Sequence, residues 1–279
     1  MKLVRFGHRG EEKPGLIDNE GNIRDLSSVI PDLSGVHLMP DALDKIRSAD
    51  VDALDVITPD VRISTCVARP GKLICVGLNY KDHAEEADMQ TPTEPIIFMK
   101  ATSAMSGPYD DIVLPPNSTQ TDWEVELGVV IGDYATQVSE QEAHTKIAGY
   151  CVVNDLSERH FQLERGGQWV KGKSFDTFAP VGPYLVTPDE LPSIEDGLAL
   201  TLTVNDKTMQ SGNTNNMIFS IPYLIHYISG FTTLEPGDII ATGTPAGVGM
   251  GQQPRRFLQR GDTLKTAIAH LGEQKQNVV

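Results

Sequence analysis

The sequence predicts a mostly β fold with some α-helix (α+β), arranged as a mixed β barrel or sandwich. Seven segments after residue 70 are rich in β-branched residues and bounded by Gly, Pro or Asp, which is typical of strands. Helical periodicity is confined to a few short stretches. Strands and helices do not alternate regularly, so a doubly wound parallel sheet is not expected.

The first part of the chain predicts a small unit of its own. Short strand-like segments lie at residues 2–6, 15–18 and 23–26. The last two flank Asn19–Asn22 and are expected to form a hairpin. Residues 43–57 carry helical periodicity. Residues 67–71, which include Pro70 and Gly71, look like a joint. We therefore expect a small N-terminal α+β domain at residues 1–68.

The remainder of the chain predicts more strands than helices. Strands are expected at residues 72–76, 96–99, 123–131, 149–153, 184–186, 198–204 and 238–242. Helices are expected at residues 81–87, 140–147 and 220–229.

Composition excludes several classes of protein. The chain has 38 acidic and 23 basic residues, a net charge of −15, so its surface would repel a nucleic-acid backbone. It has no apolar run long enough for a transmembrane helix and no signal-peptide pattern, so we expect a cytoplasmic protein without membrane partners. The cysteines are scattered, and Cys75 and Cys151 lie in apolar runs, where they are expected to act as core residues.

Glu124 and Glu126 are the centre of the functional prediction. Residues i and i+2 of a strand point to the same face, so these carboxylates project side by side, with Val125 and Leu127 on the other face. Two neighbouring carboxylates repel each other unless a cation lies between them or one of them is protonated. The apolar run that follows places the pair next to a core, where solvent screens charge weakly.

Asp155 supplies a third carboxylate at the end of another predicted strand. Three carboxylates without a nearby Cys or His pair favour a hard cation, Mg²⁺ or Mn²⁺, over zinc. From the spacing alone, the pair of glutamates can also be the solvent face of an edge strand or the acid pair of a glycosidase. The glycosidase interpretation fits less well, because its carboxylates flank a bond from opposite sides.

His83 and Glu86 lie three residues apart on a predicted helix, so their side chains can touch. A carboxylate beside an imidazole fixes its tautomer and raises its basicity, which suits a general base. A surface ion pair on a short polar helix is the alternative interpretation.

Two lysines and a loop are further candidates. Lys100 ends an apolar strand and Lys173 follows Trp169–Gly172; each can neutralise the acidic cluster or the substrate, although a strand-end lysine can also extend into solvent. Residues 242–249 form a glycine-rich loop without the Gly-Lys-Ser/Thr ending of a P-loop. Its amides could hold a carboxylate, and a plain turn is the alternative.

Taken together, these segments resemble the fumarylacetoacetate hydrolase family. The similarity covers about residues 70–270 and consists of ordered motifs: Gly77-Leu78-Asn79-Tyr80-Lys81-Asp82-His83, Phe98-Met99-Lys100, Asp122-Trp123-Glu124-Val125-Glu126-Leu127, Asn154-Asp155, Lys173-Ser174-Phe175-Asp176-Thr177-Phe178 and Thr242-Gly243-Thr244-Pro245-Ala246-Gly247-Val248-Gly249.

The resemblance implies a mixed β-sandwich roll that is usually a homodimer, with a catalytic domain at residues 69–279. It also implies Mg²⁺ (or Mn²⁺) as the cofactor and a catalytic His-Glu pair on a lid. The residues expected in the site are, for the metal, Glu124, Glu126 and Asp155; for catalysis, His83, Glu86 and Lys173; and for substrate binding, Lys100, Gln168 and Thr244.

The segment at residues 162–173 is similar to family members that hydrolyse 2,4-diketo-3-deoxy sugar acids. The resemblance therefore implies a metal-dependent hydrolase that cleaves the C–C bond of a 2,4-dioxo acid, such as an acylpyruvate, to pyruvate and a second acid. An isomerase, a hydratase, an oxaloacetate decarboxylase or a ureidoglycolate lyase are the alternative enzymes. A non-catalytic 2-oxo acid binding protein is the alternative of another class, although binding alone needs no general base such as His83.

Overall fold

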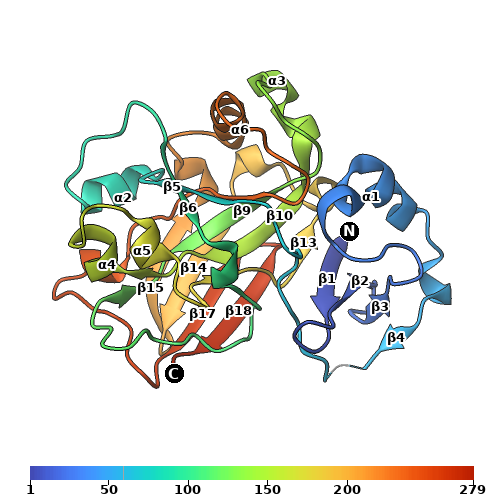
Figure 1. The fold of residues 1–279 in the computed structure, drawn as a ribbon, viewed down its shortest axis with the longest axis horizontal. Helices are drawn as coiled ribbons and strands as arrows, with labels where there is room; N and C mark the ends of the chain where they lie inside the picture. Colours follow the sequence, from blue (N-terminus) through green and yellow to red (C-terminus); the bar gives the residue numbers. More distant parts are fainter. Residues whose placement is uncertain (59) are drawn as a thin grey trace.

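The computed structural model describes residues 1–58 and 60–279 and has the α+β fold that the sequence predicts (Figure 1). Its largest sheet contains ten strands in the spatial order β4 (Val56–Ile57), β3 (Ile23–Asp25), β2 (Lys13–Ile17), β1 (Lys2–Phe6), β13 (Leu185–Val186), β10 (Ile147–Asn154), β9 (Val125–Ile131), β16 (Ile239–Ala241), β5 (Leu73–Gly77) and β6 (Ile96–Lys100). Paired strands run antiparallel, except β5 and β16, which are parallel.

A second, antiparallel sheet of four strands packs against the first. Its order is β15 (Lys207–Asn213), β14 (Ala199–Val204), β17 (Thr263–Ile268) and β18 (Gly272–Asn277). Two short ladders complete the β structure: β8 (Thr121–Asp122) with β11 (Ser157–Glu158), and β7 (Met105–Ser106) with β12 (Ala179–Pro180).

The helices are short and lie around the sheets. They are α1 (Pro40–Arg47), α2 (Lys81–Glu86), α3 (Glu140–Ala143), α4 (Arg159–Leu163), α5 (Val170–Lys173) and α6 (Ile221–Ser229). Short 3₁₀ helices lie at Gly35–Leu38, Val51–Ala53, Thr102–Ala104, His144–Lys146, Pro188–Glu190, Ile194–Asp196, Thr214–Asn216 and Gly249–Gly251. Helices α2, α4 and α5 gather on one side of the molecule, and α1 lies on the other (Figure 1). In the part of the chain that the structure describes, no helix has the length and apolarity needed to span a membrane.

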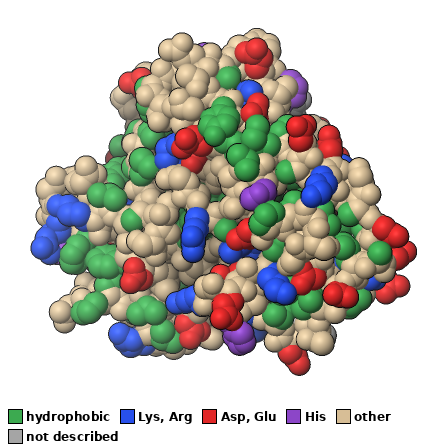
Figure 2. All heavy atoms as spheres, turned by 45° about the vertical axis from the view of Figure 1, so that its right-hand side comes forward, with side chains coloured by type: hydrophobic (Ala, Val, Ile, Leu, Met, Phe, Trp, Pro, Cys, Tyr) green, Lys and Arg blue, Asp and Glu red, His purple; other side chains and the backbone are tan. Residues whose placement is uncertain are grey.

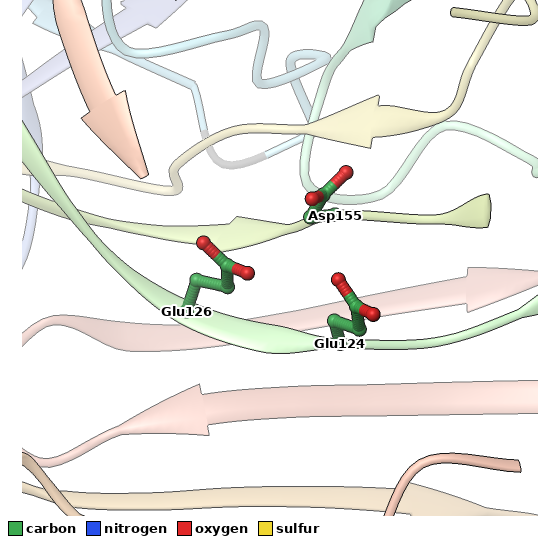
Figure 3. Close-up of side chains that lie close together, drawn as sticks. All are labelled: Glu124, Glu126 and Asp155. Carbon is green, nitrogen blue, oxygen red and sulfur yellow. The ribbon is translucent and has the colours of Figure 1, made fainter. Parts of the chain in front are cut away.

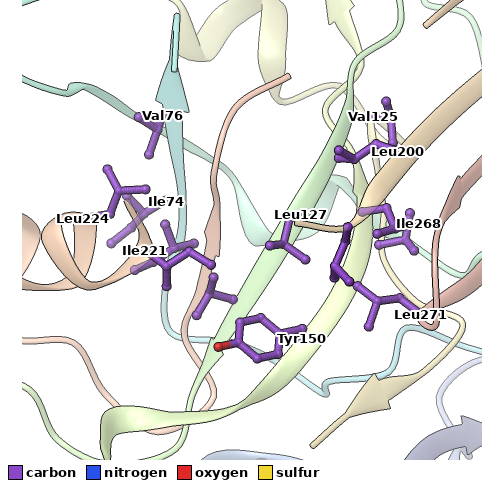
Figure 4. Packing of buried hydrophobic residues seen from close by; sticks show 14 of the residues in the cluster. Ile74, Val76, Val125, Leu127, Tyr150, Leu200, Ile221, Leu224, Ile268 and Leu271 are labelled. Atoms are coloured by element: carbon purple, nitrogen blue, oxygen red, sulfur yellow. The ribbon is translucent and has the colours of Figure 1, made fainter. Parts of the chain in front are cut away.

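Strand β9 is buried along its whole length because both of its faces are covered. One face contributes Val125 and Leu127 to a core shared with Leu200 and Ile268 of the second sheet (Figure 4). The opposite face contributes Val130 to a second core, which also contains residues of the N-terminal strands and of α1. The pattern that predicted this strand, a continuous apolar run, is the one expected for a strand with two buried faces.

Most predicted elements are confirmed with shifts of one or two residues at their ends, but two predicted helices are too long. The helix expected at residues 43–57 is wrong in its second half: α1 ends at Arg47, and the chain continues through a 3₁₀ turn into β4. Strand β4 forms because Ile57 pairs with Ile23 of β3, a contact that local periodicity does not reveal. The helix expected at residues 140–147 ends early, since Ile147 begins β10.

The N-terminal strands extend the large sheet, because β1 pairs with β13. The N-terminal hairpin of β2 and β3 forms as predicted, with Ile17 opposite Ile23. The division of the chain into two domains at residue 68 stays a prediction.

Candidate active site

The three predicted acidic residues lie together. Glu126 is on β9 and Glu124 immediately precedes that strand, so the two side chains rise from the same face, while Asp155 faces them from the end of the neighbouring β10 (Figure 3). The antiparallel register, in which Val153 is opposite Glu126, brings the end of β10 to the start of β9. One oxygen of each carboxylate lies within 4.8 Å of those of the other two, and all three side chains are buried.

Buried cations surround two of these carboxylates. Lys173 donates to Glu124 Oε2 at 2.6 Å and to Asp155 Oδ2 at 2.8 Å. Arg159 donates to Glu124 Oε1 at 2.7 Å, and Lys100 donates to Asp155 Oδ1 at 2.5 Å. Burial raises the pKa of Glu124, but the positive charges of Lys173 and Arg159 outweigh burial and lower this pKa to about 2.

Glu126 has no such partner among the described residues. Its carboxylate accepts a hydrogen bond from the backbone N–H of Gly243 at 2.9 Å. Burial and the negative charges of Asp155 and Glu124 raise the pKa of Glu126 well above its usual range. A buried carboxylate next to two others is stabilised as an anion if a cation binds among them. The oxygen-only donor set suits Mg²⁺ or Mn²⁺, so these residues fit a hard divalent ion.

The predicted His-Glu pair is formed. His83 and Glu86 lie on α2, and His83 Nδ1 is 3.2 Å from Glu86 Oε2. The other carboxylate oxygen of Glu86 accepts a hydrogen bond from the backbone N–H of Gly247 at 2.9 Å. Glu86 is therefore held from two sides and orients the imidazole. No described residue forms a hydrogen bond with Nε2 of His83, so this nitrogen is free to bind another group.

The glycine-rich loop holds carboxylates of the protein itself. Its backbone N–H groups donate to Glu126 from Gly243, to Glu86 from Gly247, and to Asp122 from Gly249, the last at 2.6 Å. At Gly243 and Gly247 φ is +99° and +106°, a left-handed conformation that side chains disfavour. A Cβ at Gly247 would also collide with the carbonyl of Met209. The loop thus links the acidic cluster to the His83–Glu86 pair.

The substitution Gly251→Ala tests this linkage. A Cβ at this position would lie 2.6 Å from Glu86 Oε1. Because the clash is with side-chain atoms of Glu86 and not with backbone, we expect an intact fold and a displaced Glu86, with turnover reduced by about 10- to 100-fold. Steady-state kinetics and thermal unfolding measure both quantities. When combined with Glu86→Gln, the alanine should cause no further loss; a further loss would show that it acts elsewhere.

His83 and Glu86 line one cavity of about 380 Å³ together with Glu124 and Glu126, whereas Asp155 is not among its lining residues. Its polar wall is formed by His83, Glu86, Glu124, Glu126, Arg159, Gln162, Lys173 and Thr244. Its apolar wall includes Val76, Ile96, Phe98, Leu163, Trp169, Val248 and Met250. The cavity is large enough for a small acid of several carbon atoms, and both polar and apolar side chains line it.

The predicted substrate-binding residues are placed differently from one another. Thr244 lines the cavity, but its hydroxyl donates to the Val125 carbonyl at 2.9 Å. Lys100 does not line the cavity; its ammonium group donates to Asp155 and, at 2.8 Å, to the Leu156 carbonyl. Gln168 is exposed and also lies outside the cavity wall.

Three residues of the site were not predicted. Arg159 is buried and bridges Asp122, at 2.8 Å, to Glu124. It also donates to the side-chain carbonyl of Gln162 at 3.0 Å. The available signal was their position: Arg159 lies between Asp155 and Lys173, Gln162 begins the segment at residues 162–173, and Asp122 begins the motif that contains Glu124.

Comparison with known proteins identifies the family. Residues 72–279 match the model of the fumarylacetoacetate (FAA) hydrolase C-terminal family. The chain belongs to the fumarylacetoacetate hydrolase family. It is therefore an enzyme of a family whose named members include hydrolases of keto acids.

Relatives of this family member cover its whole length. A 2,4-didehydro-3-deoxy-L-rhamnonate hydrolase from Sphingomonas sp. (strain SKA58) is 52% identical over 279 residues, covering 100% of this chain and 96% of the relative. Fumarylacetoacetate hydrolase from Exiguobacterium antarcticum is similar in structure, with a TM-score of 0.89 and 33% identity over 100% and 99% of the two chains. Maleylpyruvate hydrolase from Sphingobium sp. SYK-6, solved with a manganese(II) ion and pyruvate, has a TM-score of 0.82 and 30% identity over 100% and 99%.

Proposed function

We propose that this family member is a divalent-metal-dependent hydrolase that cleaves the C–C bond of a 2,4-dioxo acid. The products would be pyruvate and a second acid. The observation that carries the proposal is a carboxylate cluster suited to a hard cation, two members of which, Glu124 and Glu126, line the same cavity as a His83–Glu86 pair suited to activating water.

The proposed metal ligands are Glu124, Glu126 and Asp155, and the proposed ion is Mg²⁺ or Mn²⁺. Such an ion supplies a Lewis acid that polarises the 2-oxo group of the substrate. Support comes from the geometry of the three carboxylates and from the manganese-containing structure of the Sphingobium relative.

The charges of the site favour an anionic substrate once a divalent ion is bound. The buried groups comprise four carboxylates, Asp122 and the three proposed ligands, against three cations, Lys100, Lys173 and Arg159. With all four carboxylates ionised and the His83–Glu86 pair not counted, these buried groups carry one net negative charge, which a divalent ion would convert to one net positive charge. A substrate carboxylate then neutralises it, so the acidic surface of the protein is no obstacle to an acidic substrate.

His83 is proposed as the general base. It takes a proton from water, and Glu86 stabilises the imidazolium and keeps the ring oriented. The hydroxide adds to the C4 carbonyl, the C3–C4 bond breaks, and its electrons pass to the 2-oxo group, giving the enolate of pyruvate. That enolate takes up a proton at C3, while C4 becomes the new carboxylate. Lys173 and Arg159 place positive charge beside the region where the negative charge develops.

For the substrate, we propose a diketo sugar acid or a simple acylpyruvate. The name of the Sphingomonas relative, which is 52% identical, supports the first. Of the predicted substrate contacts, Thr244 remains proposed through its place in the cavity wall. We also propose a homodimer. Aromatic side chains follow one another along α6, with the ring centroids of Tyr223 and Tyr227 6.2 Å apart, and the row ends at Phe231, which is 61% exposed and offers an apolar surface for a second copy.

Turnover in H₂¹⁸O tests the reaction type. If water attacks C4, one labelled oxygen should enter the new carboxylate of the fragment that carried C4, and pyruvate should gain label only by slow exchange at its ketone. Mass spectrometry of the products of 2,4-didehydro-3-deoxy-L-rhamnonate and of an acylpyruvate measures this. A single product of unchanged mass would instead indicate an isomerase. Turnover of oxaloacetate alone, with release of CO₂, would indicate a decarboxylase.

A further inference from the structure

Three arginines line a second cavity that adjoins the active-site cavity. Arg255, Arg256 and Arg260 fall within six positions of a chain that has a net charge of −15. They line this second cavity, of about 520 Å³, together with Thr119 and other residues, and no acidic side chain is among the described residues that line it. Arg255 lines this cavity and the active-site cavity alike, so the two cavities adjoin at its side chain.

The loop that carries the arginines is held in place by contacts at several points. The backbone N–H of Arg256 donates to the Gly249 carbonyl at 3.0 Å, and that of Leu258 donates to the Thr121 carbonyl at 2.8 Å. Leu258 is buried. The carboxylate of Asp262 accepts from the Gln259 backbone at 2.8 Å and from Arg256 at 2.7 Å. The backbone that carries the arginines is thus set before any ligand arrives, which lowers the entropy cost of binding.

Two of the three arginines carry uncompensated charge. Asp262 neutralises Arg256. Arg255 and Arg260 form no ion pair or side-chain hydrogen bond with any part of the chain that the structure describes. Glu158, a buried acid that contacts the cavity-lining Ser118, already has hydrogen-bond partners: Ser118 donates to it, as do Thr121 at 3.0 Å and the backbone of Gln120 at 3.3 Å.

We propose that Arg255 and Arg260 form an anion-binding site beside the active-site cavity, in which small carboxylate anions collect. Guanidinium groups bind carboxylates through paired hydrogen bonds. In a protein of high negative charge, a local positive region raises the concentration of an anionic substrate beside that cavity. Only the identity of the physiological occupant, the substrate carboxylate, rests on the proposed function.

The first test compares KM and kcat across a series of NaCl concentrations. Arg260 does not line the active-site cavity, so Arg260→Gln should leave kcat unchanged and raise KM about tenfold at low salt. Arg260→Lys keeps the positive charge, so its KM should be close to that of the wild type. The difference should shrink as salt screens the charge. The control is Arg9→Gln, which removes the same charge from the turn between β1 and β2, where Arg9 is 73% exposed. Equal KM shifts in the two glutamine variants, or no shift in Arg260→Gln, would overturn the site.

The second test locates the anion without any substrate. Crystals soaked in selenate should show an anomalous peak between Arg255 and Arg260 in the wild-type protein and none there in Arg260→Gln. The same peak in both proteins, or no peak at this place, would also overturn the proposal. Selenate binding without turnover of any dioxo acid would refute the proposed function and leave the site standing. Turnover of a dioxo acid without selenate binding or a KM shift would refute the anion-binding site and leave the proposed function standing.

Discussion

The substitution Glu126→Gln is expected to reduce turnover by about 10³-fold or more without unfolding the protein. Glutamine has the same shape as glutamate and can still accept the hydrogen bond from Gly243, so the loop should stay in place. The negative charge is lost, however, and with it a proposed metal ligand that forms no ion pair with a lysine or arginine among the described residues. Calorimetric titration with Mg²⁺ and Mn²⁺ should show a large loss of affinity, and unchanged affinity would contradict the assignment.

Thermal unfolding of the same variant provides a second measurement. Without metal, Glu126→Gln should unfold at a temperature equal to or above that of the wild type, because repulsion from Asp155 and Glu124 is removed. Added Mn²⁺ should stabilise the wild type by about 2.7 kcal/mol at roughly 100 times Kd and leave the variant unchanged. Glu273→Gln, at an exposed position of β18, is the control and should respond to metal as the wild type does.

The elements that were predicted correctly are those whose side-chain pattern directly reflects burial. Strand β9 has an apolar sequence because both faces are covered. Strands β17 and β18 were not predicted, and β18 shows why. Its inward residues include Gln274 and Gln276, and Gln274 Nε2 donates to the carbonyls of Val152 and Gly182 at 2.9 Å and 3.0 Å. Polar residues with buried partners remove the hydrophobic alternation on which the prediction depends.

The same distinction applies to the site. The proximity of Glu124 and Glu126 follows from strand geometry alone, and that of His83 and Glu86 from helix geometry. Asp155 joins them through its place at the end of a predicted strand, and the family resemblance supports this set; local patterns alone do not show which strands are neighbours. The role of Arg159 could not be predicted, since a buried arginine is recognised only by its partners, here Asp122 and Glu124.

Lys100 illustrates the limit of interpreting a charge by its place in a strand. Its position at the end of β6 indicated a partner for the acidic cluster or for the substrate, and the two possibilities could not be separated. In the structure its ammonium group is fully buried against Asp155. Burial and the charge of nearby Lys173, opposed by Asp155, lower the pKa of Lys100. Its contacts therefore favour a role in positioning Asp155 over one in substrate binding.

The substitutions His83→Ala and Glu86→Gln should each reduce turnover by about 10²- to 10⁴-fold, the range found for positioned acid–base catalysis. If Glu86 acts through His83, as proposed, the double variant should be little worse than the more damaged single variant. Mg²⁺ affinity should be unchanged in all three, because neither side chain belongs to the acidic cluster. The matched control is Glu85→Gln, which removes the same charge from an exposed neighbour on α2 and should leave turnover unchanged. If the losses of turnover multiply in the double variant, the two residues act independently. Equal losses of turnover in Glu85→Gln and Glu86→Gln would show that the effect comes from the total charge of α2 and not from the His83–Glu86 pair.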